Sequence, residues 1–526
     1  MTELSDDTVA RILEILAERT RASERIAGSF IPPHVGIVEE TAARRHQLVV
    51  GRRGVGKSML LLNVVSAASK KGELAIYMDL ESLRGIPYPD VLIRLVSELA
   101  ESLRRHLRTE AGPFKAFGTR FRLRRLERQL DQLLAAPQTR ETTIQIAEGL
   151  GHGVDIEGAV KGRTPFASAQ LGGGFRRRKS SSTESAATFT QTKMEGLQAA
   201  VPEYRELLSR AVESMRAKRA TLVLDDLYFI PRHDQPDVLA YLHQIVKGLE
   251  IWLKIGGVEH RLLPFVEGDP PRGLQPYQDA GLIRLDATLR DFAHTSGYLE
   301  GILQGALDEA QSEIGDMLTE TGRQRLILAA GGVPRDYLNI AAAALRRSTK
   351  RKDAPNRPRN RINAEDVSEV APDFLDQKER ELTLDASPED VERLRNRFND
   401  IVKFCVHEHR RNVFLVEATK LTDEQWGRDT ASLAELRFIH NVGNLTVKSG
   451  SPKYTGRRYE AYVLDLSAYA GTRVRQIEMI NFWETEEKQR IRGATFIYRP
   501  EEGGTRSLVE VEDEAISGEQ MSFGLE

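Results

Sequence analysis

Short hydrophobic runs alternate with amphipathic stretches along most of residues 47–290. The runs are typical of buried strands. The stretches between them carry apolar side chains three and four positions apart, which predicts helices. Strands that alternate with helices predict a parallel sheet with crossover connections. The five predicted strands cover 47–50, 74–79, 220–224, 252–258 and 282–285.

The hydrophobic pattern changes on either side of this core, and these changes divide the chain. An amphipathic helix is predicted at 8–19, and a wholly helical region follows the last strand. Residues 348–364 are basic and contain Pro and Asn, which is typical of a linker. We therefore expect a lead-in at 1–46, a core at 47–290, a helical region at 291–347, a linker at 348–364, a further domain at 365–500 and an acidic tail at 501–526.

The core pattern is interrupted between about 110 and 198. A basic helix is predicted at 112–135, and residues 149–193 are rich in Gly, Ser and Thr, with a basic run at 176–179. Compact domains rarely contain structureless connections longer than about 15 residues. We therefore expect an inserted arm, partly helical and partly mobile, in which 153–162 could pair as a hairpin.

Composition and charge narrow the function classes. A chain of 526 residues is too long for one hydrophobic core, and 40% hydrophobic with 29% charged residues is ordinary for a soluble protein. Its 75 basic and 77 acidic residues nearly cancel, so any nucleic-acid signal must be local. A single cysteine, Cys405, excludes internal disulfides and fits a cytoplasmic protein. We expect neither a membrane-spanning helix nor a secretory signal.

A complete phosphate-binding motif follows the first predicted strand. Residues 51–58 (GRRGVGKS) match G-x-x-x-x-G-K-[ST], and a helix is predicted after them. The glycines let backbone N–H groups turn inward around phosphates, Lys57 reaches the β- and γ-phosphates, and Ser58 holds Mg²⁺. The predicted ligand is therefore ATP with Mg²⁺. The predicted nucleotide-binding residues are Gly51, Arg52, Arg53, Gly54, Val55, Gly56, Lys57, Ser58 and Met59.

Two carboxylates end the third predicted strand. Such a strand can bring one acid, Asp225, to the Mg²⁺ shell opposite Ser58. The second acid, Asp226, can polarise the attacking water as a general base. The alternative is that Asp226 caps the following turn.

The order of these motifs resembles an AAA+ ATPase module of the origin-recognition-complex-like initiator type. The P-loop, the strand that ends in Asp225, the strand at 252–258 and the Gly-Gly-Val-Pro-Arg segment at 331–335 carry the resemblance. It covers roughly residues 20–345 without the insertion. The resemblance implies a helical lid and an arginine at the start of a lid helix that contacts the γ-phosphate, a place that Arg335 matches. The alternative is an ordinary surface arginine.

The sequence departs from this family after the strand at 252–258, where the family usually has Asn, Ser or Thr as a phosphate sensor. Glu259, His260 and Arg261 follow instead. The related STAND signalling ATPases often place an arginine there, so a STAND-like protein with Arg261 as its sensor remains an alternative. Arg272 stands where a finger that projects into a neighbouring subunit would lie, although a plain loop arginine is also compatible with the sequence.

The last domain resembles a winged helix. A helix is predicted at 430–440, strands at 445–448 and 458–466, and a wing-like loop between the strands. On such a wing, four basic residues would face DNA phosphates. Winged helices also serve as protein-contact modules, so both partners remain open. The DNA-binding candidates are Lys448, Lys453, Arg457 and Arg458.

The sequence thus predicts an α/β P-loop NTPase, a parallel sheet flanked by helices, with a helical lid, an inserted helical or hairpin arm and a C-terminal winged-helix domain. Three functions compete. The first is an ATPase that acts on double-stranded DNA. The second is a STAND-like sensor that forms ATP-dependent homo-oligomers, for example in prokaryotic antiviral defence with a separate effector. The third is an ATPase subunit whose winged helix docks a partner protein.

Overall fold

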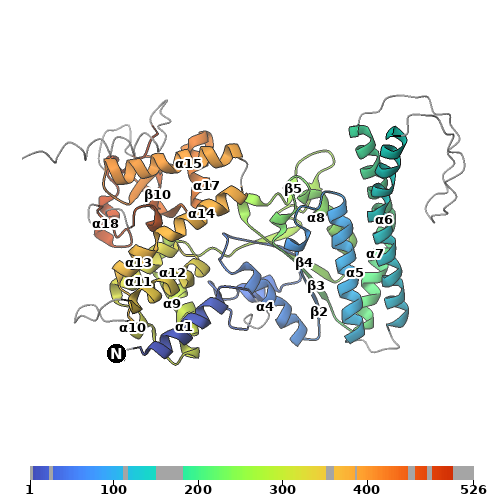
Figure 1. Ribbon diagram of the computed structural model, residues 1–526, viewed down its shortest axis with the longest axis horizontal. Helices are drawn as coiled ribbons and strands as arrows, with labels where there is room; N and C mark the ends of the chain where they lie inside the picture. Colours follow the sequence, from blue (N-terminus) through green and yellow to red (C-terminus); the bar gives the residue numbers. More distant parts are fainter. Residues whose placement is uncertain are drawn as a thin grey trace, which may run out of the picture.

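The computed structural model describes residues 4–22, 28–109, 116–149, 182–350, 360–385, 388–447, 456–470 and 477–500. The central sheet lies between a group of long helices on one side and the lid with the C-terminal domain on the other (Figure 1). None of the helices in these ranges has the length and apolar character to cross a membrane. The predicted hairpin at 153–162, the basic run at 176–179, the tail at 501–526 and most of the linker lie outside the described residues.

Five parallel strands form the central sheet, in the order β2-β3-β4-β1-β7. All five predicted strands are confirmed, with ends that differ by two residues or fewer. Strand β4 lies between β1, which leads into the P-loop, and β3, which ends in Asp225. The strands are β1 (His46–Val50), β2 (Leu74–Asp79), β3 (Ala220–Asp225), β4 (Ile251–Gly257) and β7 (Ala280–Arg284).

Both faces of the sheet are covered by helices. Alternate side chains of each strand point to opposite faces, so each strand contributes apolar residues to two cores. Val49 and Val223 pack into the core beneath α4, whereas Leu48 and Leu222 pack into the core on the other face. The ribbon shows α4 on one side of the strands and α5 and α8 on the other (Figure 1). The flanking helices are α3 (Ile37–Thr41), α4 (Lys57–Lys70), α5 (Asp90–Thr109) and α8 (Gln235–Val246).

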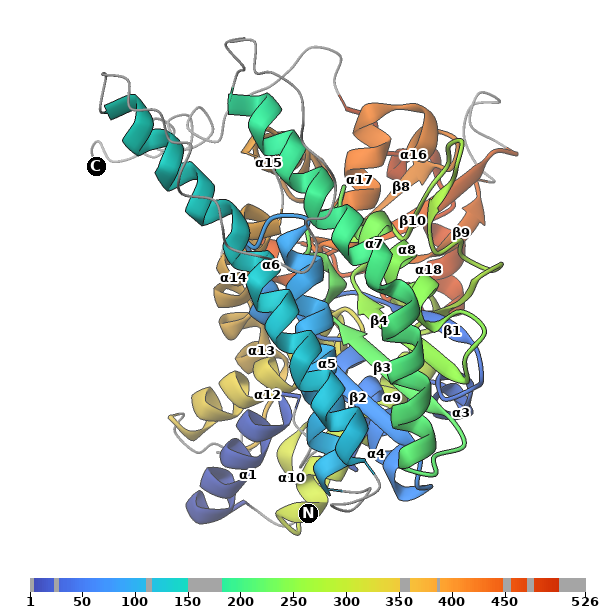
Figure 2. The same cartoon turned by 90° about the vertical axis from the view of Figure 1, so that its right-hand side faces the viewer.

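The arm consists of two long helices, α6 (Phe117–Gly149) and α7 (Ser182–Ser214), that lie beside α5 (Figure 2). The described bases of both helices share one hydrophobic core with the sheet, so the arm extends a helical layer. The predicted basic helix is confirmed as the first part of α6. The arm was expected to be partly helical, and its Gly-, Ser- and Thr-rich stretch is helical from Ser182, where α7 begins.

Six helices of the described residues form the lid. Gly331, with a φ of 57°, ends α11, and Pro334 begins α12. This turn carries the Gly-Gly-Val-Pro-Arg segment that the sequence singled out. The N-terminal helix α1 packs on α9 and α12. The helices are α1 (Asp6–Arg19), α9 (Phe292–Glu309), α10 (Ile314–Met317), α11 (Glu320–Ala330), α12 (Pro334–Thr349) and α13 (Ala364–Val370).

The C-terminal domain combines helices with a three-stranded antiparallel sheet in the order β8-β10-β9. It shares a continuous hydrophobic core with the lid. The helix predicted at 430–440 is wrong at its end, because Arg437 adopts a φ of 70° and turns the chain into β9. The elements are α14 (Pro372–Asp385), α15 (Pro388–Val402), β8 (Val413–Glu417), α16 (Lys420–Asp423), α17 (Gln425–Glu435), β9 (Ile439–Thr446), β10 (Arg458–Leu464) and α18 (Thr485–Arg490).

Candidate nucleotide site

The P-loop wraps the start of α4 in the shape that the motif predicts. Gly54 and Gly56 have φ values of 85° and 98°, which side-chain-bearing residues rarely adopt. The ammonium of Lys57 is buried and donates hydrogen bonds to the carbonyls of Gly51 at 3.1 Å and Arg52 at 3.0 Å. Lys57 therefore lies across the loop, where it can exchange these carbonyls for phosphate oxygens.

A cavity of about 340 Å³ opens over this loop. The P-loop from Arg53 to Met59 forms its floor, and Asp226 also borders it. The lid contributes α12 through Arg335 and Leu338. The cavity is thus enclosed by parts of the chain far apart in sequence. Its other lining residues are Arg19, Thr20, Ala22, Ser29, Phe30, Ile31, Glu81, Tyr228, Phe229, Tyr298, Ile302 and Pro334.

Asp225 is held in one orientation at the end of β3. It is 1% exposed, its Oδ2 accepts a 2.6 Å hydrogen bond from the hydroxyl of Tyr77, and its Oδ1 accepts from the backbone N–H of Asp226 at 2.9 Å. Gly256 in β4 leaves room for it, because a Cβ atom there would collide with Oδ1. These contacts fix the carboxylate close to the P-loop, and they fit the role of a metal-shell acid.

Asp226 faces the cavity and has the electrostatics of a proton acceptor. Burial, and next the charge of Asp225, raise its pKa to about 7, while Lys57 and Arg53 act in the opposite direction. Its backbone is left-handed, with a φ of 56°, where β3 gives way to the next turn. No capping hydrogen bond joins its side chain to the turn that follows. Asp226 thus stands at the N-cap position of this turn without a capping hydrogen bond from its side chain, and its role as the base stays a prediction.

Lys57 and the two acids are mutually dependent. Burial lowers the pKa of Lys57, and the charges of Asp226 and Asp225 counteract part of this effect. Both acids thus stabilise the cation that the P-loop needs for phosphates. This coupling places Lys57, Asp225 and Asp226 in one electrostatic unit.

Arg52 points away from the cavity and links the P-loop to the segment after β7 and to the turn between α11 and α12. Its Nε donates to Oδ1 of Asp286 at 2.9 Å, and its other nitrogens donate to the carbonyls of Ala287 at 2.8 Å and Gly331 at 3.0 Å. Its side chain therefore positions the loop and does not face a ligand. Neither Arg52 nor Gly51 lines the cavity.

Arg335 lies at the cavity wall, where the resemblance implied a lid arginine. Its backbone N–H donates to the carbonyl of Gly54 at 3.2 Å, so α12 starts directly on the P-loop. Its guanidinium is 27% exposed, and its Nη2 donates to Oε1 of Glu381 at 3.5 Å. Its buried Nε has no hydrogen-bond partner among the described residues. The surface-residue alternative does not fit this position.

The other two arginine candidates lie away from the cavity wall. Arg261 packs over the ring of Tyr228, with its Cζ 4.6 Å from the ring centroid, and only Tyr228 borders the cavity. Arg272 lies in β6 (Arg272–Gly273), and its Nη1 donates to both carboxylate oxygens of Asp237, at 2.9 and 3.0 Å. Neither arginine lines the cavity: Arg261 contacts Tyr228, which borders it, and Arg272 lies outside it.

The structure describes two of the four DNA-binding candidates. Arg457 is half exposed and pairs with Glu417 at 2.7 Å, so its charge is partly neutralised. Arg458 is exposed at the start of β10. Lys448 and Lys453 lie outside the described residues. No cluster of metal-ligating side chains occurs in the part of the chain that is described, and Cys405 is a buried free thiol.

Several residues of the site escaped the sequence reasoning. Phe30 and Ile31 come from a segment that looked like a simple lead-in, and Tyr298 and Ile302 look like ordinary core positions of α9. Their apolar character was visible, but only the folded lid brings them to the P-loop. Tyr77 occupies an alternating position of β2 that gave no polar signal of its own.

Comparisons with known proteins give little further information. No protein-family model matches the chain, and no curated protein matches it. Among solved structures, the Aeropyrum pernix ORC1 protein in complex with DNA aligns with 89% of this chain and 91% of its own, at 15% identity and a TM-score of 0.31. A likeness this weak carries no argument about the site, which stands on its own geometry.

Proposed function

We propose that this protein is an ATPase of the AAA+ type that binds ATP and Mg²⁺ beneath its helical lid and hydrolyses ATP. One observation carries the proposal: a single cavity is bordered by the P-loop, by Asp226 and by Arg335 of the lid. Phosphoryl transfer needs a phosphate cradle, a metal-binding acid, a group that orients water and a cation on the γ-phosphate. The cavity and the residues beside it offer a candidate for each.

Each residue has a definite role in this proposal. The amides of the P-loop and the ammonium of Lys57 bind the β- and γ-phosphates. Ser58 and Asp225 would hold Mg²⁺, which when bound neutralises charge on the phosphates. Asp226, whose pKa is raised to about 7, can accept a proton from the attacking water. Arg335 closes the lid on the γ-phosphate.

The partner is proposed from the C-terminal domain and the arm. The element order α15, β8, α16, α17, β9, β10 with a three-stranded sheet supports a winged helix. Exposed arginines of α6 give the arm a basic face. We therefore propose double-stranded DNA as the partner. The alternative, a STAND-like sensor, draws support from the contact of Arg261 with Tyr228, which borders the cavity. Docking of a separate partner protein remains the third possibility.

The decisive experiment measures ATP binding and hydrolysis by wild type and Lys57→Ala, with and without duplex DNA. Lys57→Ala should abolish tight ATP binding, because the phosphates lose their main cation. Lys70→Ala is the matched control, since Lys70 is exposed at the other end of the same helix. A folded Lys57→Ala protein that binds ATP as wild type does would overturn the proposed site. Stimulation of hydrolysis by DNA would favour the DNA partner over the two alternatives.

A further inference from the structure

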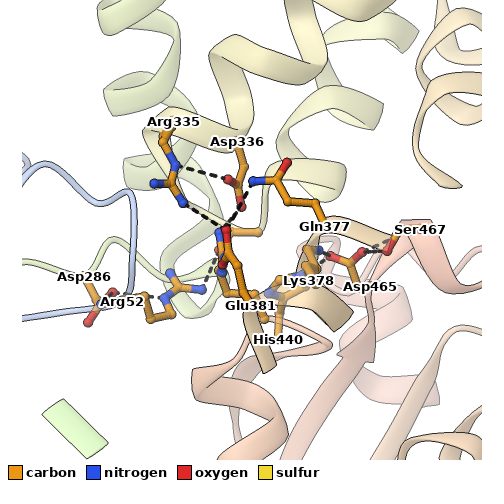
Figure 3. A network of polar contacts seen from close by, with 12 residues as sticks. Arg52, Asp286, Arg335, Asp336, Gln377, Lys378, Glu381, His440, Asp465 and Ser467 are labelled. Carbon is orange, nitrogen blue, oxygen red and sulfur yellow. Dashed lines mark hydrogen bonds and ion pairs between the residues drawn. The ribbon is translucent and has the colours of Figure 1, made fainter. Parts of the chain in front are cut away.

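Four charged residues form a closed ring between the lid and the C-terminal domain. Figure 3 shows three of them, Arg335, Asp336 and Glu381, close together. Arg335 and Asp336 begin α12 of the lid, Glu381 lies on α14, and Arg437 lies between α17 and β9. Each acid contacts both arginines. Positive and negative groups therefore alternate around the ring, and its net charge is zero.

The two arginines are held very differently. Arg437 is 4% exposed, and it donates to Oδ2 of Asp336 at 2.5 Å and to Oε2 of Glu381. Arg335 is 3.5 Å from Glu381 and 4.0 Å from Asp336, and only the first contact is a hydrogen bond. Arg437 is thus the fixed cation of the ring, and Arg335 is the loosely held one.

The fixed side of the ring continues into the C-terminal domain. Asp465, 1% exposed, accepts from Lys378 at 2.6 Å and pairs with His440 at 2.7 Å. The ring of His440 packs on Gly331 so closely that a Cβ atom there would collide with it. Burial lowers the pKa of His440, which keeps it neutral. The C-terminal domain therefore packs on the turn between α11 and α12, which leads directly to Arg335.

If Arg335 left the ring, the buried charges that remain would no longer cancel. The ring would then contain the carboxylates of Asp336 and Glu381 with only the guanidinium of Arg437, a net charge of −1. Buried uncompensated charge is costly unless water or another cation reaches it. Asp336 is only 5% exposed. Water could therefore reach its carboxylate only if the packing of the C-terminal domain on the lid loosened.

We propose that Arg437 is a positioning residue for Arg335, and that a γ-phosphate draws Arg335 out of this ring and so loosens the C-terminal domain. This inference rests on the proposed function, because it needs a nucleoside triphosphate in the cavity. ADP has no γ-phosphate and leaves the ring closed. The C-terminal domain thereby responds to which nucleotide is bound, and it in turn sets the preference for ATP over ADP.

The first test uses two variants that act in opposite directions on the ratio of ATP to ADP affinity. Glu381→Gln removes the acid that holds Arg335, so the preference for ATP should rise about five-fold or more. Arg437→Met leaves Arg335 as the sole cation for two acids, so the preference should fall by a similar factor. A merely structural role would not move this ratio in opposite directions. Arg437→Lys keeps the charge and should lie between wild type and Arg437→Met.

The second test follows amide hydrogen exchange in the full-length protein with no nucleotide, with ADP and with a non-hydrolysable ATP analogue. The analogue should increase exchange in α14 and β9, whereas ADP should not. Arg335→Met should remove the difference, and Arg490→Gln, which breaks an exposed ion pair with Glu478, should keep it. Equal exchange with both nucleotides, or equal shifts in Glu381→Gln and Arg437→Met, would overturn the inference and leave the proposed function standing. A wild-type protein that binds no nucleotide would overturn both the inference and the proposed function.

Discussion

The hydroxyl of Tyr77 on β2 donates a 2.6 Å hydrogen bond to Oδ2 of Asp225 at the end of the neighbouring strand β3. Burial, and then the negative charge of Asp225, raise the pKa of Tyr77, so the hydroxyl stays protonated and remains a donor. The other oxygen, Oδ1, accepts the backbone N–H of Asp226 at 2.9 Å, so the two bonds together fix the carboxylate. The neighbouring strand therefore orients the acid that we assign to the metal shell.

Tyr77→Phe should lower the affinity for Mg²⁺ without removing ATP binding. The variant retains the ring and loses only the hydrogen bond to Asp225. We expect the Mg²⁺ concentration for half-maximal activity to rise about ten-fold, the lower end of what such orienting residues contribute. Metal-free ATP binding should match wild type. Tyr88→Phe, whose hydroxyl contacts Met194, is the control. An unchanged Mg²⁺ dependence would show that Tyr77 does not orient a metal ligand.

Asp226→Asn should retain ATP and slow its hydrolysis. The amide cannot accept a proton from water, and the loss of a general base costs about 100-fold or more in rate. Single-turnover hydrolysis and direct binding, measured on the same preparation, separate the two effects. Asp308→Asn is a control, since Asp308 is exposed near the end of α9 and lies outside the cavity. Turnover at the wild-type rate would assign the base elsewhere.

The sequence was most informative where chemistry and local structure coincide. The P-loop needs a strand, a glycine turn and a helix in one short stretch, so 51–58 could be assigned before any tertiary contact was known. The same holds for Asp225, because the end of a buried strand in a parallel sheet is a defined place. Arg335 required the family resemblance to be singled out, since an arginine after Val-Pro has no local signature.

The remaining parts depend on distant partners, which one sequence does not reveal. Arg437 looked like part of a helix, and only its positive φ and its two acids show why the helix ends there. Glu381 lies on a helix whose charges look solvated in sequence. Arg272 looked available as a finger, but Asp237, 35 positions away in the chain, already binds it. Ion pairs between separate elements are therefore the least predictable part of this site.

Arg272→Ala tests assembly. If Arg272 acts on the site of a neighbouring subunit, it must first leave Asp237, and ATP should promote oligomers that can be measured by light scattering. The variant should bind ATP normally and lose hydrolysis. Arg284→Ala is a suitable control, because it breaks a comparable exposed pair with Glu259. A protein that stays monomeric with ATP and keeps full activity after Arg272→Ala would exclude the finger.

The free energy of unfolding should depend on pH through the protonation of His46. Its Nδ1 accepts a hydrogen bond from the backbone N–H of Leu253 at 3.0 Å, and burial, then the charge of His243, lower its pKa to about 4. The unfolded chain takes up this proton near pH 6.5, earlier than the folded protein. The contribution of His46 is therefore fully present above pH 6.5 and is lost as the pH falls toward 4.

His46→Gln should reduce that loss. We expect the free energy of unfolding to fall between pH 7 and 4 by about 2–3 kcal/mol less in His46→Gln than in wild type. Denaturant unfolding at each pH measures the difference. His233→Gln is the matched control, because His233 is exposed. An acid dependence identical to wild type would show that His46 does not titrate with unfolding in this range.

The last prediction concerns DNA and the exposed face of α6. Leu123, Leu126 and Leu130 point into the core, and the arginines between them are exposed. Two phenylalanines, Phe117 at 69% and Phe121 at 65% exposure, lie on the same side of the helix. Spacings of three, four and seven positions place the group on one face. Arg122 of this helix pairs with Glu206, and three other exposed arginines of α6 have no ion-pair partner among the described residues: Arg124, Arg125 and Arg128.

Replacement of these three arginines by glutamine should weaken binding to duplex DNA and reduce its salt dependence. Each phosphate contact releases counterions, so the slope of log affinity against log salt should fall by roughly one unit per lost contact. The control replaces Lys70, Lys71 and Lys218, which are exposed and lie outside α6. Arg457→Gln should change less than any one of the three, because Glu417 already neutralises that guanidinium. Wild type that binds no duplex at low salt with ATP present would reject DNA as the partner, and equal slopes for the triple variant and wild type would assign the contacts to another surface.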